Sequence, residues 1–139
     1  MYKRQVSVLG ALFFWTQYRT LNLMLLGDEA AVTLGTDLHR WRIVYLLAAS
    51  LLVGFAVYTA GIIGFVGLVI PHLVRSVVGP DHRKLVPLAT LFGAIFLIWV
   101  DVGARIIKPP AEIPVGILTA FLGAPLFLWM IKVRRYEFQ

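Results

Sequence analysis

The sequence contains no cysteine and few charged residues. Of its 139 residues, 14% are charged and only 7 are acidic. The absence of cysteine excludes disulfides and thiolate metal sites, and it leaves the redox compartment undetermined. Apolar residues are abundant instead, at 60% of the chain, and the mean hydropathy is +0.84. This composition indicates an integral membrane protein.

The motifs of several enzyme and binding classes are also missing. No G-x-x-x-x-G-K-[ST] phosphate-binding loop occurs, so any energy taken from ATP must come through another chain. No H-E-x-x-H occurs, and His39, His72 and His82 form no ligand pair at helical spacing, so neither a metal site nor a cofactor is expected. The net charge of +6 lies beside apolar runs, which favours cytoplasmic loops and lipid headgroups over nucleic acid.

Long apolar stretches predict an all-α, polytopic transmembrane helical bundle. A helix needs about 20 apolar residues to cross the core of a bilayer. Residues 43–63, 85–107 and 113–133 meet that requirement. Residues 65–78 form a shorter apolar segment, which is interrupted by Pro71. A proline inside a helix removes a backbone donor and bends the helix, so a short, bent helix is expected there.

The N-terminal residues resemble a span whose earlier half is missing. Residues 6–18 are long enough for only part of a crossing, and the polar residues 1–5 stand where the preceding turns would lie. No signal-peptide pattern is present. We therefore expect a truncated or mis-assembled N-terminus, since residues 1–5 do not resemble a native start. The chain would be a C-terminal fragment, and several of its helix faces would lack their neighbours.

The basic residues predict the orientation of the spans, because they collect at the cytoplasmic ends of membrane helices. Lys3 and Arg4 are left out of the count, because residues 1–5 stand where the earlier half of the first span should be. Of the other basic residues, if residues 65–78 cross the membrane, nine share one side and only Arg105 and Lys108 lie on the other. If they do not cross, the bias reverses. We therefore predict that this segment crosses and that the C-terminus is cytoplasmic. The nine are Arg19, Arg40, Arg42, Arg75, Arg83, Lys84, Lys132, Arg134 and Arg135.

Residues 20–39 are predicted to form two short helices in a cytoplasmic loop. Gly27 and Gly35 punctuate this loop. Asp28 can cap the second helix, and Glu29 suits the positive end of its dipole. The loop also has an apolar surface where the topology places water, and this surface either folds back onto the spans or docks on a partner. Its members are Leu23, Met24, Leu25, Leu26, Ala30, Ala31 and Leu34.

Glycines recur at a spacing of three before the short apolar segment. They are Gly61, Gly64 and Gly67, and Pro71 follows them. Small residues at this spacing allow either close helix packing or an unwound turn. We therefore expect these four residues to form a packing or hinge segment.

Five sequence motifs occur in order between residues 20 and 135. They are L-L-G-D-E-A-A-V-T-L-G at 25–35, G-I-I-G-F-V-G-L-V-I-P-H at 61–72, G-P-D-H-R-K-L-V-P at 79–87, D-V-G-A-R at 101–105 and A-E-I-P-V-G-I-L-T-A-F-L-G-A-P-L-F at 111–127. Together they resemble the C-terminal part of the permease subunit of bacterial ABC importers for iron-siderophores, haem and cobalamin. The resemblance implies about ten spans in the whole subunit. It also implies a second permease subunit, a cytoplasmic ATPase dimer that uses ATP and Mg²⁺, and a location in the bacterial inner membrane.

The resemblance further implies roles for particular residues. The segment at 25–35 matches a pair of coupling helices that sit in a cleft of the ATPase, which favours docking over folding back. The implied coupling residues are Leu25, Leu26, Gly27, Asp28, Glu29, Ala30, Leu34 and Gly35. Arg105 matches an arginine that receives an acidic residue of the periplasmic substrate-binding protein. Arg105 can also pair with Asp101 one helical turn earlier, and both roles can coexist.

The resemblance thus predicts a transport subunit, not an enzyme, in an ATP-driven importer of iron-siderophore, haem or cobalamin. Two other classes stay open. A secondary, ion-coupled transporter also has short broken helices but needs an ion site at mid-membrane, and only Asp101, near a helix end, approaches that role. An intramembrane hydrolase needs a nucleophile facing a base, for which Ser50, Thr59 and His72 are poor candidates.

Overall fold

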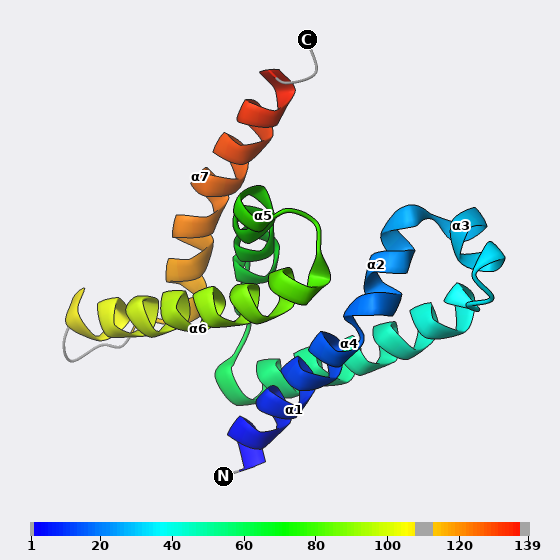
Figure 1. Ribbon diagram of the computed structural model, residues 1–139. Coiled ribbons are helices and arrows are strands. Elements are labelled where there is room, and N and C mark those ends of the chain that lie inside the picture. Colours follow the sequence, from blue (N-terminus) through cyan, green and yellow to red (C-terminus); the bar gives the residue numbers. More distant parts are fainter. Residues whose placement is uncertain (1, 108–112, 137–139) are drawn as a thin grey trace.

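Seven helices make up the part of the chain that the structure describes, residues 2–107 and 113–136 of a computed structural model (Figure 1). No strand occurs within those residues. This confirms the all-α fold. The helices are α1 (Tyr2–Thr16), α2 (Tyr18–Leu26), α3 (Asp28–Thr33), α4 (Leu38–Ala60), α5 (Val66–Val78), α6 (His82–Ile107) and α7 (Val115–Tyr136).

Three of these helices are long and apolar enough to cross a membrane. They are α4, α6 and Val115–Val133 of α7, and α5 is a shorter apolar helix of 13 residues. Both α4 and α6 begin before the predicted spans, because each has a polar start. The side chain of Asp37 accepts the Arg40 N–H at 3.3 Å and caps α4. At α6, the Asp81 carbonyl accepts the Leu85 N–H at 2.9 Å.

The N-terminal helix differs from the sequence-based expectation. Helix α1 begins at Tyr2, so the polar residues from there to Gln5 belong to the same helix as the apolar residues that follow. The predicted partial span also extended to residue 18, whereas α1 ends at Thr16 and α2 begins at Tyr18. The break at Gln17 separates the apolar helix α1 from α2, most of which lies in the predicted loop of residues 20–39.

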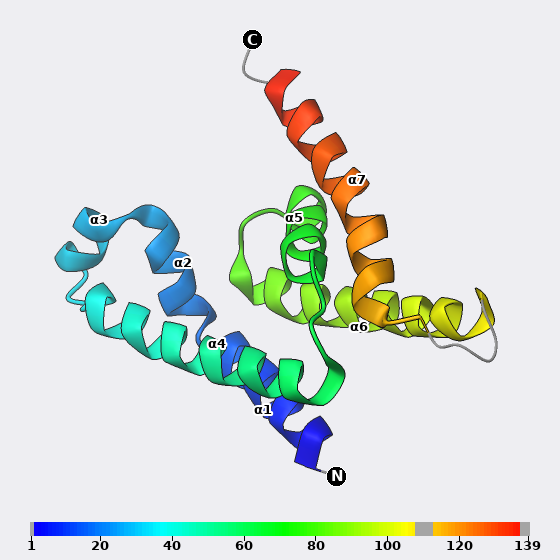
Figure 2. The ribbon, with the colours of Figure 1, turned by 180° about the vertical axis from the view of Figure 1, so that it is seen from behind.

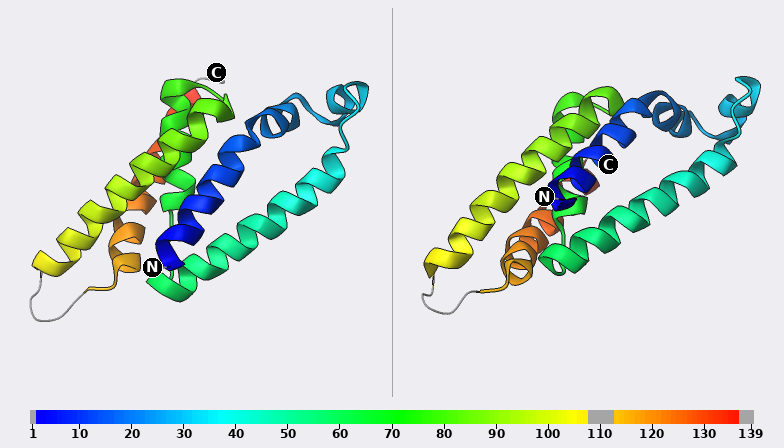
Figure 3. Two further views of the ribbon diagram at one scale, coloured as in Figure 1. Left: turned by 60° about the horizontal axis from the view of Figure 1, so that its bottom comes forward. Right: turned by 90° about the horizontal axis from the view of Figure 1, so that it is seen from below.

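The helices form two groups, one of α1 to α4 and one of α5 to α7. Helices α5, α6 and α7 pack on one another (Figures 1 and 2). Helix α1 packs on both α4 and α6, and it runs between them in Figure 3. Among the described residues, α4 packs on α1, α2 and α3 and not on α5, α6 or α7. The contact between the two groups is therefore made by α1 and α2 on α6.

The two ends of the bundle carry different elements. Figure 3 (left) shows α2, α3, the turn between α5 and α6, and the C-terminal end of α7 at one end. The C-terminal ends of α4 and α6 lie at the opposite end. The connection from α4 to α5 starts at that opposite end, and α5 occupies only part of the length of the bundle.

The connection between α4 and α5 is irregular from Gly61 to Phe65. Both ends of it have positive φ, 79° at Gly61 and 63° at Phe65. The predicted hinge residues divide here, since Gly61 and Gly64 lie in this connection while Gly67 and Pro71 lie inside α5. A Cβ added at Gly64 or Gly67 would meet no atom within 4 Å of the described chain.

Close packing against this connection comes instead from two glycines of α7. A Cβ at Gly116 would overlap the carbonyl oxygen of Ile62, and a Cβ at Gly123 would overlap the Cβ of Phe65. Phe65 also packs on Phe127, with ring centroids 6.5 Å apart. The absence of side chains at the two glycines lets the irregular segment lie directly against α7.

Candidate functional site

The candidate site is the pair of short helices α2 and α3, whose boundaries are set by glycine. Gly27 joins them with a φ of 93°, and Gly35 follows α3 with a φ of 71°. The Gly35 N–H donates to the Val32 carbonyl at 3.0 Å, which ends α3. Residues with a Cβ are strained at such angles, so the glycines permit two sharp turns within a few residues.

Large apolar side chains on these helices are exposed. The exposed fractions are 45% at Leu25, 68% at Leu26 and 63% at Leu34. Val32, which the sequence did not single out, is 74% exposed. Leu23 and Met24 are only partly exposed, because α2 packs on α6. Folding back therefore covers part of the predicted apolar surface. Leu25, Leu26, Val32 and Leu34 stay uncovered within the described chain, and we call these four residues the α2–α3 apolar surface.

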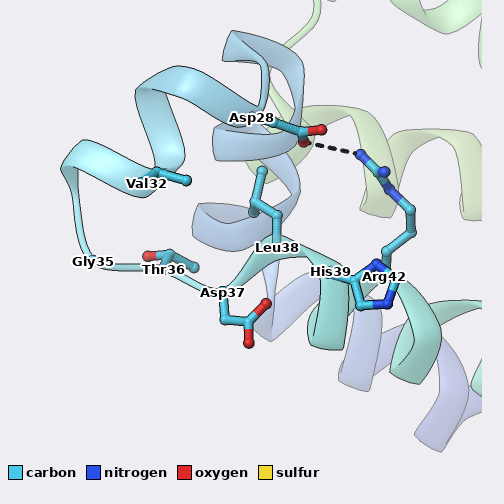
Figure 4. A pocket seen from close by; sticks show the side chains of 8 residues that line it. All are labelled: Asp28, Val32, Gly35, Thr36, Asp37, Leu38, His39 and Arg42. Atoms are coloured by element: carbon cyan, nitrogen blue, oxygen red, sulfur yellow. Dashed lines mark hydrogen bonds and ion pairs between the residues drawn. The ribbon is translucent and has the colours of Figure 1, made fainter.

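The acidic residues at the start of α3 are placed differently from the prediction. Asp28 is itself the first residue of α3, so it lies inside the helix and not at the N-cap. Its carboxylate accepts from Arg42 Nη2 of α4 at 3.2 Å (Figure 4). Glu29 lies in the first turn as expected and is exposed. Both carboxylates suit the positive end of the helix dipole.

The Asp28–Arg42 pair closes one side of a hollow between α3 and α4. The hollow has a volume of about 460 Å³. Figure 4 shows Val32, Leu38 and His39 among its lining side chains. Both members of the pair are more than half exposed, so water screens the attraction and the pair contributes about 0.2–1 kcal/mol. Its main effect is to orient α3 against α4.

A hydrogen-bond cluster ties α2 to the turn between α5 and α6. Asn22 Nδ2 donates to Asp81 Oδ1 at 2.7 Å. The His82 backbone N–H donates to Asn22 Oδ1 at 2.8 Å, and His82 Nδ1 lies 2.9 Å from the same oxygen. We call Asn22, Asp81 and His82 the α2–turn cluster. No local sequence signal marks Asn22 as a functional residue, because its partners lie about sixty positions later in the chain.

The surroundings fix the orientation of the Asn22 amide. Its oxygen faces the His82 N–H and its nitrogen faces a carboxylate, so the flipped amide would place like dipoles together at both contacts. Because Asn22 Oδ1 is an acceptor, His82 Nδ1 is the donor in this contact. The Asn22 amide and the Arg83 backbone N–H at 3.0 Å both stabilise the charged form of Asp81, and so they lower its pKa.

Two aromatic residues hold the same turn from α1 and α2. Trp15 Nε1 donates to the Arg83 carbonyl at 3.1 Å. The Arg83 guanidinium lies over the ring of Tyr18, 5.9 Å from its centroid. The N-terminal end of α6 is therefore held by both α1 and α2.

The opposite end of the bundle carries the Asp101–Arg105 pair. Arg105 Nε lies 3.0 Å from Asp101 Oδ2, and the two side chains are 64% and 45% exposed. The i, i+4 pair expected from the sequence is therefore present, in the last turns of α6. Lys108 lies outside the described residues. The last span, predicted to begin at residue 113, begins at Val115 in the structure. No three His, Asp or Glu side chains gather as a metal site within residues 2–107 and 113–136.

Comparison with known proteins assigns the family. Residues 5–133 match the FecCD transport family. The chain belongs to this family. It is 49% identical over 121 residues to the hemin transport system permease protein HmuU of Yersinia pestis, covering 87% of this chain and 36% of that protein. It is 46% identical over 115 residues to the vitamin B12 import system permease protein BtuC of Vibrio parahaemolyticus, covering 83% and 35%.

A further relative and a solved structure support the same family assignment. The Fe(3+) dicitrate transport system permease protein FecD of Escherichia coli is 47% identical over 113 residues, which cover 81% of this chain and 36% of that protein. A solved structure described as a metal-chelate type ABC transporter in an inward-facing conformation matches with a TM-score of 0.87 and 37% identity, over 94% of this chain and 42% of that one. The FecCD chain thus has the fold of an ABC transporter permease and spans about a third of these curated relatives.

Proposed function

We propose that this chain is part of the permease subunit of an ATP-driven importer of a metal chelate, haem or cobalamin. The named relatives are permeases for hemin, vitamin B12 and iron dicitrate, which supports this range of cargo. The observation that carries the proposal is the α2–α3 apolar surface, which is exposed at the end of the bundle on two glycine-bounded helices. An exposed apolar patch of this kind is typical of a protein interface.

The proposed partner at this surface is a cytoplasmic ATPase, present as a dimer. The chain has no phosphate-binding loop, so nucleotide chemistry belongs to the partner and no bond is made or broken here. ATP binding and hydrolysis would move α2 and α3, and the bundle would open in turn to each side of the membrane. The proposed coupling residues remain Leu25, Leu26, Gly27, Asp28, Glu29, Ala30, Leu34 and Gly35.

The proposed orientation places α2, α3 and the end of α7 in the cytoplasm. The distribution of basic residues supports it. The elements at that end of the bundle carry Arg19, Arg40, Arg42, Arg75, Arg83 and Lys84, whereas Lys3, Arg4 and Arg105 lie towards the other end. The proposed membrane is the bacterial inner membrane. In the proposed orientation Arg105 then faces the periplasm.

The proposed partner of Arg105 is an acidic residue of a periplasmic substrate-binding protein. Arg105 is paired with Asp101, but the pair is well exposed and water screens it. A second carboxylate can therefore approach the same guanidinium, which has five donors. A second permease subunit would complete the translocation path. It would share the apolar surface of α4, α6 and α7 that is uncovered within this chain with the rest of this permease and with lipid.

The experiment uses the full-length permease with its ATPase. Leu26→Asn together with Leu34→Asn should reduce copurification of the ATPase about tenfold or more, because each change removes apolar area from the contact. Thr33→Ala is the matched control, since the Thr33 hydroxyl bonds only to the Ala30 carbonyl of its own helix. Unchanged ATPase binding and uptake by the double variant, with normal membrane insertion, would contradict the proposal.

A secondary transporter remains the alternative, and one measurement separates the two. Uptake driven by ATP in proteoliposomes that have no ion gradient supports the importer. Uptake that survives removal of the ATPase and collapses with the proton gradient supports the alternative. Asp101 would then be the residue to examine, since it is the acidic residue nearest to the apolar part of α6.

A further inference from the structure

Helices α2 and α3 are connected to the rest of the bundle both along the backbone and through side-chain contacts. Along the backbone, α3 continues into α4, but within the described residues α4 packs on none of α5, α6 and α7. Through side chains, α2 packs on α6 and is bonded to the turn that begins α6. A displacement of α2 and α3 therefore reaches the α5–α7 group through α2, and through α1, which precedes α2 and also packs on α6, and not through α4.

The α2–turn cluster is suited to carry such a displacement. One residue, Asn22, makes three contacts between 2.7 and 2.9 Å, and both sides of its amide are engaged. One of the partner groups is the backbone N–H of His82, the first residue of α6. A second, Asp81 Oδ1, is a side-chain atom that is itself held to the backbone because it also accepts the Arg83 N–H. A displacement of Asn22 therefore acts on the backbone at the start of α6 and not only on the end of a flexible side chain.

We propose that Asn22 is a positioning residue that joins α2 and the α5–α6 turn into one mechanical unit, so that movement of the coupling helices is delivered directly to α6 and, through it, to α5 and α7. This inference rests on the proposed function for its biological meaning. The joint itself is a property of the described contacts. Trp15 and Tyr18 reinforce it, because both hold Arg83 of the same turn.

The first test measures the joint without reference to transport. Spin labels replace Arg19 on α2 and Lys84 in the first turn of α6, both of which are exposed, in the full-length permease with its ATPase. We expect one narrow distance distribution that is the same without nucleotide and with ATP bound. Asn22→Asp should broaden it, because two carboxylates then face each other at Asp81. A distance that changes with nucleotide in the unmodified protein would overturn the proposal.

The second test measures coupling in proteoliposomes. Asn22→Asp should keep ATPase copurification and ATP hydrolysis but lower cargo uptake per ATP about fivefold or more. Combining it with Asp81→Asn exchanges donor and acceptor, and it should restore most of the lost uptake. Thr90→Ala is the control, since that hydroxyl bonds only within α6. A normal uptake ratio in Asn22→Asp, or no recovery in the exchange variant, would overturn the proposal.

The two tests also separate this inference from the proposed function. If the unmodified protein shows no ATP-dependent uptake, the proposed function fails, while the label distances still report whether the joint exists. If uptake is ATP-dependent and Asn22→Asp transports as well as the unmodified protein does, the proposed function stands and the joint fails.

Discussion

Replacing Gly123 with alanine tests how tightly α7 holds the irregular connection between α4 and α5. The new Cβ would overlap the Cβ of Phe65, which follows the backbone and cannot rotate away. Phe65 is further constrained by its φ of 63° and by its contact with Phe127. Relief of the overlap therefore requires α7 or the connection itself to shift.

The magnitude follows from two opposing effects. Overpacking of this kind costs about 1–3 kcal/mol. Alanine in place of glycine inside a helix returns about 0.5–1 kcal/mol. The expected net loss is roughly 0–2.5 kcal/mol, and the apparent Tm should fall by about 2–4 °C for each kcal/mol. Thermal unfolding of the full-length permease in detergent measures this change.

Gly10→Ala is the matched control for this variant. Its Cβ would meet the Cδ2 of Leu52 at 2.5 Å, but those atoms are the ends of a flexible side chain. Leu52 can adopt another rotamer, so Gly10→Ala should lower the Tm by less than Gly123→Ala does. The reverse order would refute the claim that fixed backbone neighbours decide the cost.

A double-mutant cycle gives the decisive result. Phe65→Gly removes the obstructing Cβ, and glycine accepts the positive φ of this position without strain. In that background Gly123→Ala should cost almost nothing, so the two changes should be non-additive. An equal fall in Tm in both backgrounds would refute the reasoning.

Three further predictions concern the charged residues. Asp28→Asn should change the Tm little, because its pair with Arg42 is exposed and is worth about 0.2–1 kcal/mol; a large loss of stability would show that the pair is more than an orienting contact. The lowered pKa of Asp81 means that its contacts stabilise the fold fully above the ordinary aspartate pKa of about 3.9 and are lost as pH falls through the lower folded value. The Tm difference between the unmodified permease and Asp81→Asn should accordingly shrink below about pH 4, and a difference that persists unchanged down to about pH 2 would contradict this. Arg105→Gln should weaken and Asp101→Asn should strengthen binding of the substrate-binding protein, more at low salt than at high salt, because the second change removes the Asp101 charge that competes with the incoming carboxylate. Equal effects of the two variants in surface plasmon resonance would argue that only the intrahelical pair matters.

Local features of the sequence predicted most of the helices. A long apolar run favours one continuous helix, and so the apolar segments at 43–63, 65–78, 85–107 and 113–133 coincide with α4, α5, α6 and α7 to within a few residues. That each of them crosses the membrane stays a prediction. Glycine acts on its own backbone, and so Gly27 and Gly35 marked the ends of the two short helices. The i, i+4 spacing of Asp101 and Arg105 was likewise sufficient to predict their pair.

The starts of helices were predicted less well, because they depend on hydrogen bonds as well as on hydropathy. Asp37 caps α4 ahead of its apolar run, and Asp28 is drawn to Arg42 from inside the first turn of α3. The apolar surface of residues 20–39 was predicted as one patch. Packing of α2 on α6 divides it into a partly covered portion and an exposed one.

The sequence by itself thus determined that this chain is a bundle of apolar helices with two short helices in a polar loop, because hydropathy and glycine conformation act over a few neighbouring residues. Only the tertiary structure decided that Asn22 holds the turn at Asp81 and that Gly123 receives Phe65. Each of these contacts joins residues more than fifty positions apart. They exist because the packing of α2 on α6 and of α7 on α5 brings together side chains whose own neighbours in sequence give no sign of one another.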